Sequence, residues 1–266
     1  MTARLSMRTR RSPVRIKSPF NVLIGVLSVC AGIALWQYAA SELTSSLLFP
    51  GPVKVAKALS SRSGLDLIGA LGTTLKRVAL GFALGSAVGA TTGILAGNVK
   101  WLRTLVEPYV HFLRSIATLA WAGPALIWFG IGNITTEFLI FYSTVFIVLL
   151  NSIVGVTSID EQRIQMARSF GATRLDVFLQ IVLPGSFGYV LSGMRLAMSF
   201  SVATAISAEM LFGTNGVGYV IYESRLYFNF ETIFAGLVIL GVTGLVLDKI
   251  FTGVQFGLFA RYRQGR

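Results

Sequence analysis

The sequence has few of the residues, and none of the short motifs, that enzymes commonly use for chemistry. It contains one cysteine, Cys30, and one histidine, His111, which is too few for a disulfide framework or a zinc cluster. It has no Gly-x-x-x-x-Gly-Lys-Ser/Thr loop for ATP phosphates, no Gly-x-Ser-x-Gly elbow and no His-Glu-x-x-His helix. These absences predict a chain with no catalytic residue, metal or cofactor of its own, in which Cys30 and His111 have packing roles.

Charged residues are also scarce. They make up 13% of the chain, whereas a soluble domain has about a quarter, and the mean hydropathy is +0.71. We therefore predict an all-α integral membrane protein in contact with membrane lipid. The formal net charge is +12, but the basic residues lie at the termini and in loops rather than among aromatic residues, so we expect no nucleic-acid partner.

Six apolar stretches are long enough to cross a bilayer as helices, since a crossing needs about 20 residues. They are residues 20–40, 78–97, 112–131, 138–156, 189–212 and 232–251. Arg114 and Pro124 interrupt the third stretch. The first is too long for the apolar region of a signal peptide and lacks a convincing cleavage site, so we expect it to be a retained, accessory helix before a five-helix core.

The segments outside these stretches complete the predicted domain organisation. The Leu-Phe-Pro-Gly-Pro sequence of residues 48–52 indicates a rigid turn before a short helix. The predicted segments are a basic tail at 1–19, the first helix at 20–40, an external linker at 41–66, the core at 67–255 and a second basic tail at 256–266. No duplicated three-helix half is visible, which argues against an inverted-repeat carrier within one chain.

Lysine and arginine residues indicate the orientation of the chain. With six crossings both termini share one side, and that side carries six basic residues in the N-terminal tail and those at positions 100, 103, 163, 168, 174, 261, 263 and 266. The opposite side carries the basic residues at positions 54, 57, 62, 76, 77 and 225. The positive-inside rule therefore predicts cytoplasmic termini and a cytoplasmic loop at residues 158–184.

Glycines recur at every fourth position of the second stretch. They are Gly81, Gly85, Gly89, Gly93 and Gly97, and this spacing aligns them along one face of a helix where another backbone can approach closely. Two interpretations remain open, namely ordinary helix packing and a sliding contact in a transporter that moves.

The loop at residues 158–184 has the pattern of two short helices joined by a glycine. Ser158 and Glu161 predict a capping box before a helix that carries Ile164, Ala167 and Phe170 on one face, and Gly171 suits the left-handed position after it. Thr173 and Asp176 predict a second N-cap, and Pro184 is expected to stop the second helix. The alternative is an amphipathic linker on the membrane surface.

Charged residues within apolar stretches are candidates for the transport pathway or its gate, since ionised side chains in a membrane need a partner or a wet cavity. Glu209 lies near the outer end of the fifth stretch and Arg114 near the inner start of the third. For Arg114 the alternative is snorkelling to cytoplasmic headgroups, and for Glu209 a structural hydrogen bond that anchors a loop. Arg195 is expected to be an interfacial anchor.

The loop also resembles that of a known family. Gln165-Met166-Ala167, three residues, Gly171, nine residues and then Ile181-Val182-Leu183-Pro184 are similar to the EAA loop of type I ABC importer permeases, although Gln165 and Met166 depart from its first two letters. The resemblance implies coupling helices that dock on an ATP-binding subunit, with ATP and Mg²⁺ bound by that partner. The coupling residues that it implies are Glu161, Gln165, Ala167, Arg168, Gly171, Ile181, Leu183 and Pro184.

Further segments resemble the permeases for nitrate, sulfonates, taurine and bicarbonate. They are residues 48–52, Leu119-Ala120-Trp121, residues 128–132, Ala208-Glu209-Met210 and the glycine-rich residues 213–219. The resemblance implies import of a small anion, a periplasmic or lipid-anchored solute-binding protein, and a second permease copy in the inner membrane. It also adds Trp121 to the candidate pathway or gate residues.

Two other functions remain open from the residues alone. An ion-gradient-driven secondary carrier or channel would work without an ATPase, and a membrane scaffold would use the glycines and the loop only for packing. A heterodimer with a different permease would have the same sequence features as a homodimer.

Overall fold

The computed structural model describes residues 19–43 and 48–263. Helices dominate the described residues and no strand occurs among them, which confirms the predicted all-α fold. The chain divides into two compact units, one ending at Lys54 and the other beginning at Val55.

The first unit is built on the helix α1, Pro19–Tyr38, which continues into the π-helical segment Ala39–Leu43. Residues Leu23–Glu42 are long and apolar enough to cross a membrane, in agreement with the predicted first helix. The next helix, α2, covers Pro52–Ser60. It corresponds to the short helix expected after the proline-rich turn.

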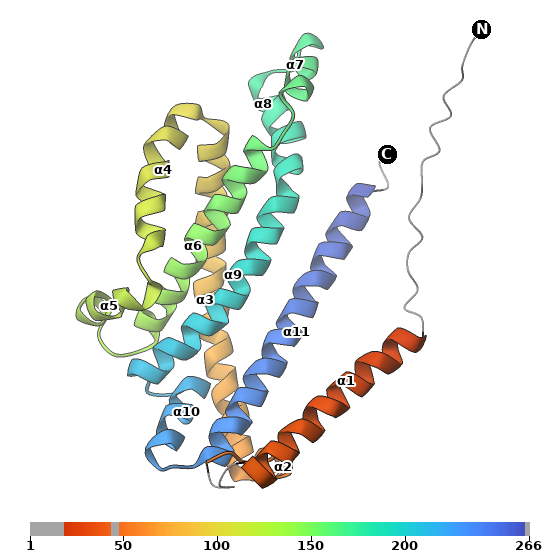
Figure 1. Ribbon diagram of the computed structural model, residues 1–266. Helices are drawn as coiled ribbons and strands as arrows, with labels where there is room; N and C mark the ends of the chain where they lie inside the picture. Colours follow the sequence, from red (N-terminus) through yellow and green to blue (C-terminus); the bar gives the residue numbers. More distant parts are fainter. Residues whose placement is uncertain (1–18, 44–47, 264–266) are drawn as a thin grey trace. The chain divides into compact units, whose positions relative to one another are not determined.

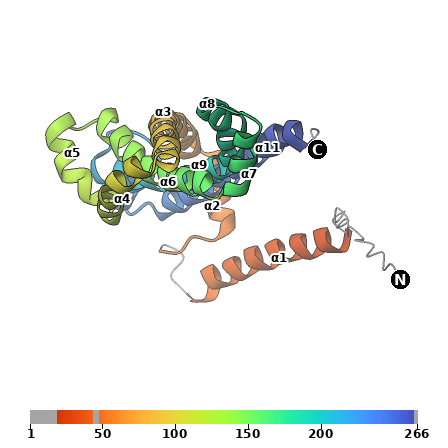
Figure 2. The same ribbon diagram turned by 90° about the horizontal axis from the view of Figure 1, so that it is seen from above.

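Four long helices dominate the second unit (Figure 1). They are α3 (Arg62–Asn98), α6 (Asn133–Thr157), α9 (Leu183–Phe212) and α11 (Phe230–Arg263). Helix α6 packs along both α3 and α9. Seen from above, α4 (Lys100–Ser115) and α5 (Ala122–Phe129) lie on one side of this group and α11 lies on the other (Figure 2).

Small polar residues let α6 pack on both neighbours. The Thr144 hydroxyl bonds the Ile140 carbonyl at 2.8 Å and the Ser201 hydroxyl of α9 at 2.8 Å. Such hydroxyls donate their hydrogen bonds to carbonyls of a helix, and the small side chains leave space for close helix contacts. The short helices α7 (Glu161–Ser169), α8 (Arg174–Val177) and α10 (Val217–Leu226) cap the two ends of the group.

The prediction of one continuous third span over residues 112–131 is wrong. Helix α4 begins already at Lys100, the chain is extended at Ile116 and Ala117, and a 3₁₀ turn at Thr118–Trp121 leads into α5. The two helical parts meet at 87°. The charged residues at the start of α4 lower its hydropathy and hide its beginning, so the described residues hold five candidate spans, or six if the bent pair counts as one.

Helix α3 is also longer than the predicted stretch at 78–97. It begins at Arg62, so the expected linker at 41–66 runs into the helix, and Lys76 and Arg77 are helical rather than part of a loop. The polar residues of this first half lower the hydropathy without interrupting the helix.

The glycines of α3 face α6 at very short range. A Cβ atom on Gly85 would lie 2.7 Å from Thr144 Cβ, and one on Gly93 would lie 2.5 Å from the Leu149 carbonyl oxygen. Gly81, Gly89 and Gly97 are equally close to α6, with nearest distances of 2.6 to 2.7 Å. A pair of glycines that the sequence pattern did not single out, Gly155 and Gly193, makes similar contacts between α6 and α9.

The close contact between the glycines of α3 and helix α6 leads to a prediction about stability. Gly93→Ala forces a methyl group against α6 and should lower the free energy of unfolding by about 1 to 3 kcal/mol, the usual cost of overpacking. Gly69→Ala is the matched control, because its Cβ would meet no atom within 4 Å on the same helix, and it should be neutral or stabilising by about 1 kcal/mol. Thermal unfolding in detergent, followed by circular dichroism, measures both; equal stability of the two variants would contradict the packing argument.

Candidate functional site

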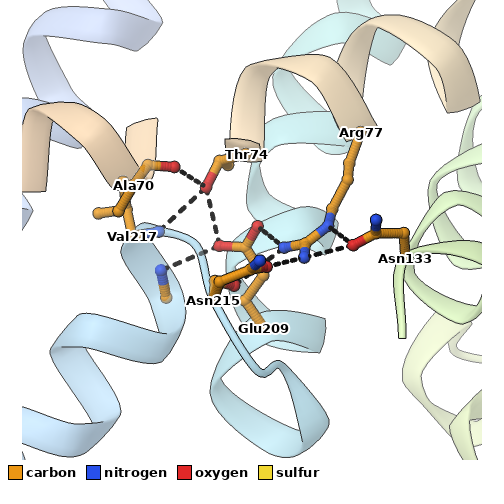
Figure 3. Close-up of polar contacts among 8 residues, drawn as sticks. Ala70, Thr74, Arg77, Asn133, Glu209, Asn215 and Val217 are labelled. Carbon is orange, nitrogen blue, oxygen red and sulfur yellow. Dashed lines mark hydrogen bonds and ion pairs between the residues drawn. The ribbon is translucent and has the colours of Figure 1, made fainter. Parts of the chain in front are cut away.

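A buried ion pair joins α3 to α9. Arg77 Nη1 lies 2.7 Å from Glu209 Oε1, and the two side chains are 3% and 0% exposed. A buried pair of charges is stable only where further hydrogen bonds satisfy the remaining donors and acceptors. The surroundings of both groups supply these bonds (Figure 3).

The second oxygen of Glu209 holds the start of α10. The Thr74 hydroxyl donates to Glu209 Oε2 at 2.9 Å, and the Gly218 N–H donates to the same atom at 3.0 Å. The Val217 N–H donates to Thr74 Oγ1 at 3.0 Å. Because the first amides of a helix lack partners within it and carry partial positive charge, the carboxylate and Thr74 together cap α10.

The other donors of Arg77 reach two asparagines. Nε and Nη2 donate to Asn133 Oδ1 at 2.9 and 2.6 Å, and Nη1 donates to the Asn215 carbonyl at 2.9 Å. Nη2 also donates to Asn215 Oδ1. Asn133 is the first residue of α6, so one guanidinium connects α3, α6, α9 and the loop before α10.

The loop between α9 and α10 fits this network only with glycine at one position. Gly216 has φ +106°, and a Cβ there would lie 2.3 Å from the carboxyl carbon of Glu209. Any other residue would be strained and would collide with the carboxylate.

The sequence identified Glu209 as a candidate gate residue but did not predict the residues that it contacts. Arg77 was counted among the basic residues on the side opposite the termini, just before the second span; it lies inside the helix instead, because α3 begins at Arg62. The signal was present in the spacing of Thr74 and Arg77, which places both on one face of a helix. Only the fold shows that Glu209 meets that face.

The loop at residues 158–184 forms two short helices as predicted, but the first cap differs. Asp160 is the N-cap of α7 and accepts from the Gln162 N–H at 2.9 Å. Ser158 instead donates to the Gly155 carbonyl at 2.9 Å. The predicted capping box of Ser158 with Glu161 is therefore wrong, since α6 extends to Thr157 and Ser158 ends it.

The turn and the second cap follow the expected pattern. Gly171 has φ +85°, and the Ala172 N–H donates to the Ala167 carbonyl at 3.1 Å. The Thr173 N–H donates to Asp176 Oδ2 at 2.9 Å and the Asp176 N–H donates to Thr173 Oγ1 at 3.2 Å. These bonds complete a capping box at the start of α8.

Pro184 does not stop a helix. The chain passes from α8 through the π-helical segment Phe178–Val182 into α9, and Pro184 lies in the first turn of α9. A proline is tolerated there because its missing N–H needs no partner. Ile181 and Leu183 thus lie where the loop enters a membrane helix.

The two short helices have an inner and an outer face. The inner face packs in an apolar cluster centred on Val156, Val177 and Val182, which Ile164 and Ala167 join. The outer face exposes large apolar side chains, and the most exposed are Met166 (61%), Phe170 (86%) and Leu175 (65%). Phe170 was predicted to share a face with Ile164 and Ala167; it lies outside instead, because it follows the last helical residue of α7.

Polar residues surround these apolar side chains. Glu161, Gln165, Arg168 and the arginines at positions 163 and 174 are exposed on the loop. A contiguous exposed apolar surface with a polar rim is typical of a protein contact site. The outer face, defined by Met166, Phe170 and Leu175 with this rim, is therefore suited to binding another protein.

Arg114 lies far from the position expected for it. It is in the last turn of α4 rather than near the start of a span, about 20 Å along the helix from Lys100 at 1.5 Å per residue. The Arg114 side chain is much shorter than this distance and does not reach the Lys100 end of α4. Trp121 follows on the 3₁₀ turn, and its ring centroid lies 5.3 Å from that of Tyr142 on α6.

Arg195, which was expected to be an interfacial anchor, forms an ion pair. Its Nε and Nη2 donate to the two carboxylate oxygens of Asp248 on α11 at 2.7 and 2.8 Å. The pair is about half exposed and links α9 to α11. Among the described residues, no group of three or more His, Cys, Asp or Glu side chains is placed to hold a metal ion.

Known proteins are similar to this chain in sequence or in fold. The family described as binding-protein-dependent transport system inner membrane component matches residues 89–264. A probable ABC transporter permease protein of Brucella melitensis is 32% identical over 85% of this chain and 92% of its own length. The bicarbonate transport system permease protein CmpB of Synechococcus elongatus is 30% identical over 96% and 97% of the two chains.

Two further proteins extend the comparison. The taurine transport system permease protein TauC of Escherichia coli is 28% identical over 87% of this chain and 86% of its own length. In a solved structure of the inward-facing MetNI methionine ABC transporter, a chain that is 17% identical has a TM-score of 0.61 and matches 71% of this chain and 94% of its own length. The last comparison concerns the fold alone.

The ion-pair network makes a testable prediction. Arg77→Met or Glu209→Met leaves a buried charge without its partner, and each should lower the free energy of unfolding by about 3 to 5 kcal/mol. The double variant should lose less than the two single losses together, because no lone charge remains. Denaturant titration in mixed micelles measures this cycle.

The matched control for this cycle is Arg195→Met. That ion pair is half exposed, and such pairs contribute less than buried ones, so its loss of stability should be clearly smaller. Equal losses for Arg77→Met and Arg195→Met would contradict the structural role of the buried network.

Proposed function

This chain belongs to the family of binding-protein-dependent transport system inner membrane components and is the permease of an ABC importer, and we propose that it carries a small anion across the inner membrane, driven by ATP that a partner subunit hydrolyses. It is a multi-pass membrane protein. The observation that carries the proposal is the apolar outer face of the loop at residues 158–184, which stands at one end of the membrane helices.

The outer face supports docking of an ATP-binding subunit. Large apolar side chains such as Phe170 gain most from being buried by a partner, and Arg168 and its neighbours supply the polar rim. This chain is non-catalytic in the proposal. ATP and Mg²⁺ are bound by the partner, and no residue of this chain contacts them.

The inner face supports the transmission of movement. Val156 at the end of α6 and Val182 at the start of α9 share one apolar cluster with the loop, so a displacement of the loop moves both helices. In the proposed cycle, ATP binding draws two such loops together and tilts the helices between inward-facing and outward-facing states.

The other partners belong to the proposal as well. We assign a second permease copy to complete the pathway, and two exposed apolar residues, Ile127 (84%) of α5 and Ile131 (72%) just after it, offer surface for it. A periplasmic or lipid-anchored solute-binding protein would deliver the cargo at the end opposite the loop.

The proposed orientation places the loop and both termini in the cytoplasm. Lys100 and Arg103 at the start of α4 lie at the same end of the long helices as α7 and α8 (Figure 1), and α11 runs towards that end. An excess of basic residues favours the cytoplasmic side. Because Arg77 is buried, the side opposite the loop has one exposed basic residue fewer, which increases the charge difference that supports this orientation.

The cargo class is supported by the named relatives. One is a bicarbonate permease and another a taurine permease. Bicarbonate is an anion and taurine carries an anionic sulfonate. We therefore propose a small solute with a carboxylate-like, nitrate-like or sulfonate group.

Reconstitution tests this function directly. The permease, its ATPase and its solute-binding protein in proteoliposomes should take up radiolabelled taurine or bicarbonate with ATP and not with ADP, and ionophores should have no effect. Uptake that needs an ion gradient and no ATPase would favour a secondary carrier instead.

Docking through the outer face gives a separate prediction. Phe170→Ser should sharply reduce co-purification of the ATPase with tagged permease, because it removes an exposed apolar anchor, while membrane insertion is unchanged. Tyr227→Ser is the matched control, since Tyr227 is 76% exposed at the end of α10, outside the loop. If both variants recover the same amount of ATPase, the outer face is not the docking surface.

A further inference from the structure

A cavity of about 400 Å³ opens between α4, α6 and α9. Its polar lining consists of Arg114, Thr118, Ser143, Asn151 and Thr204. Tyr142, Phe146 and Phe200 supply aromatic walls. We call this cavity the Arg114 pocket, and its size suits a small ligand.

The Arg114 pocket lies in the middle of the membrane helices. Ser143 lies near the middle of α6, Asn151 lies in its second half, and Thr204 belongs to the second half of α9. The position of Arg114, about 20 Å along α4 from Lys100, agrees with this depth. A cation at such a depth faces a watery cavity or needs an anion beside it.

No carboxylate of the described residues balances Arg114. The three ion pairs found in that part of the chain involve Arg77, Arg103 and Arg195. Among the residues that line the pocket, Arg114 is the one with a charged side chain. A guanidinium keeps its positive charge in proteins, so the pocket has a net positive charge.

The surrounding bonds position the last turn of α4, which carries Arg114, and leave donors for a ligand. The Tyr142 hydroxyl donates to the Leu113 carbonyl at 2.6 Å and so ties the last turn of α4 to α6. Ser143 and Asn151 donate to carbonyls of their own helix. Within the described chain the hydroxyls of Thr118 and Thr204 make no hydrogen bond, and both can donate to an oxyanion.

We propose that the Arg114 pocket holds the anionic group of the cargo midway across the membrane, with Arg114 as its ion partner and Thr118 and Thr204 as hydrogen-bond donors. The aromatic walls contact the rest of the solute. A single cation suits a transit site, because a cargo must bind well enough to enter and weakly enough to leave. The proposal rests on the anion-import function above and names the residues that recognise the charge.

The test uses the complete importer in proteoliposomes, with radiolabelled taurine and bicarbonate as probes. Arg114→Gln should reduce ATP-dependent uptake about ten- to a hundredfold, the effect of losing one hydrogen bond to a charged group, while ATPase recruitment stays normal. Arg114→Lys should retain part of the uptake rate. Thr204→Val should have an uptake rate between those of the wild type and Arg114→Gln. Lys249→Gln, a change of an exposed basic residue of α11 outside the pocket, should leave uptake unchanged.

Each of the other outcomes shows which part of the proposal fails. Wild-type uptake that Arg114→Gln does not alter overturns the pocket and leaves the import function standing. Absence of wild-type uptake of both probes overturns the import of these anions and the pocket with it. A dimer that dissociates in Arg114→Gln, measured by size-exclusion chromatography with light scattering, would mean that Arg114 pairs with the second copy.

The phosphate of a lipid headgroup is the other anionic group that the Arg114 pocket could bind. Vesicles of phosphatidylcholine alone and vesicles with added phosphatidylglycerol distinguish it from the cargo. The uptake defect of Arg114→Gln should be the same in both. A defect that is present only with phosphatidylglycerol would assign the pocket to a lipid headgroup and overturn the proposal.

Discussion

The ion pair of Arg77 and Glu209 sets the arrangement of one end of the helix group. Two opposite charges on α3 and α9 are removed from solvent, and every further donor of the guanidinium and both carboxylate oxygens then need partners. Asn133, Asn215 and the first amides of α10 meet that need, and in doing so fix where α6 begins and where α10 starts. The glycine at position 216 is required because the carboxylate occupies the space of a side chain.

The opposite end of the same helices carries the loop with the exposed apolar face. Between the two ends, α3 and α6 are in backbone contact through glycines, and α6 and α9 through Gly155 and Gly193. Helices that approach this closely move together more easily than they slide, because sliding would bring glycine positions against side chains. Closely packed helices thus join the loop at one end to the ion-pair network at the other. This favours the packing interpretation of the glycines over a sliding contact.

The Arg114 pocket lies between these two ends, on the side where α4 breaks away. The break at Ile116 and Ala117 leaves α4 and α5 at a steep angle, and the space beside α6 and α9 is lined by polar groups as a result. Non-helical backbone within a membrane is tolerated where it lines a cavity. The interrupted span and the unbalanced arginine are thus two aspects of one structural feature.

Several parts of this molecule could be predicted from the residues alone. Apolar stretches identified the first, fourth, fifth and sixth spans, and glycine, proline and capping patterns located the helical loop with Gly171 and Thr173. These features depend on local physics, namely burial in lipid, backbone conformation and hydrogen bonds between near neighbours. Each is encoded within a few turns of chain.

Other parts were decided only by tertiary structure. The sequence placed Arg77 just before the second span and Arg114 near the inner start of the third, because hydropathy averages over a window and cannot distinguish a charged residue that ends a helix from one that finds a partner inside it. The partner of Arg77 is more than a hundred positions away, and the surroundings of Arg114 come from three separate helices. The sequence by itself determined the family, the membrane class and the loop; the packing of distant helices decided that Arg77 is paired with Glu209 and that Arg114 lines a pocket without a carboxylate.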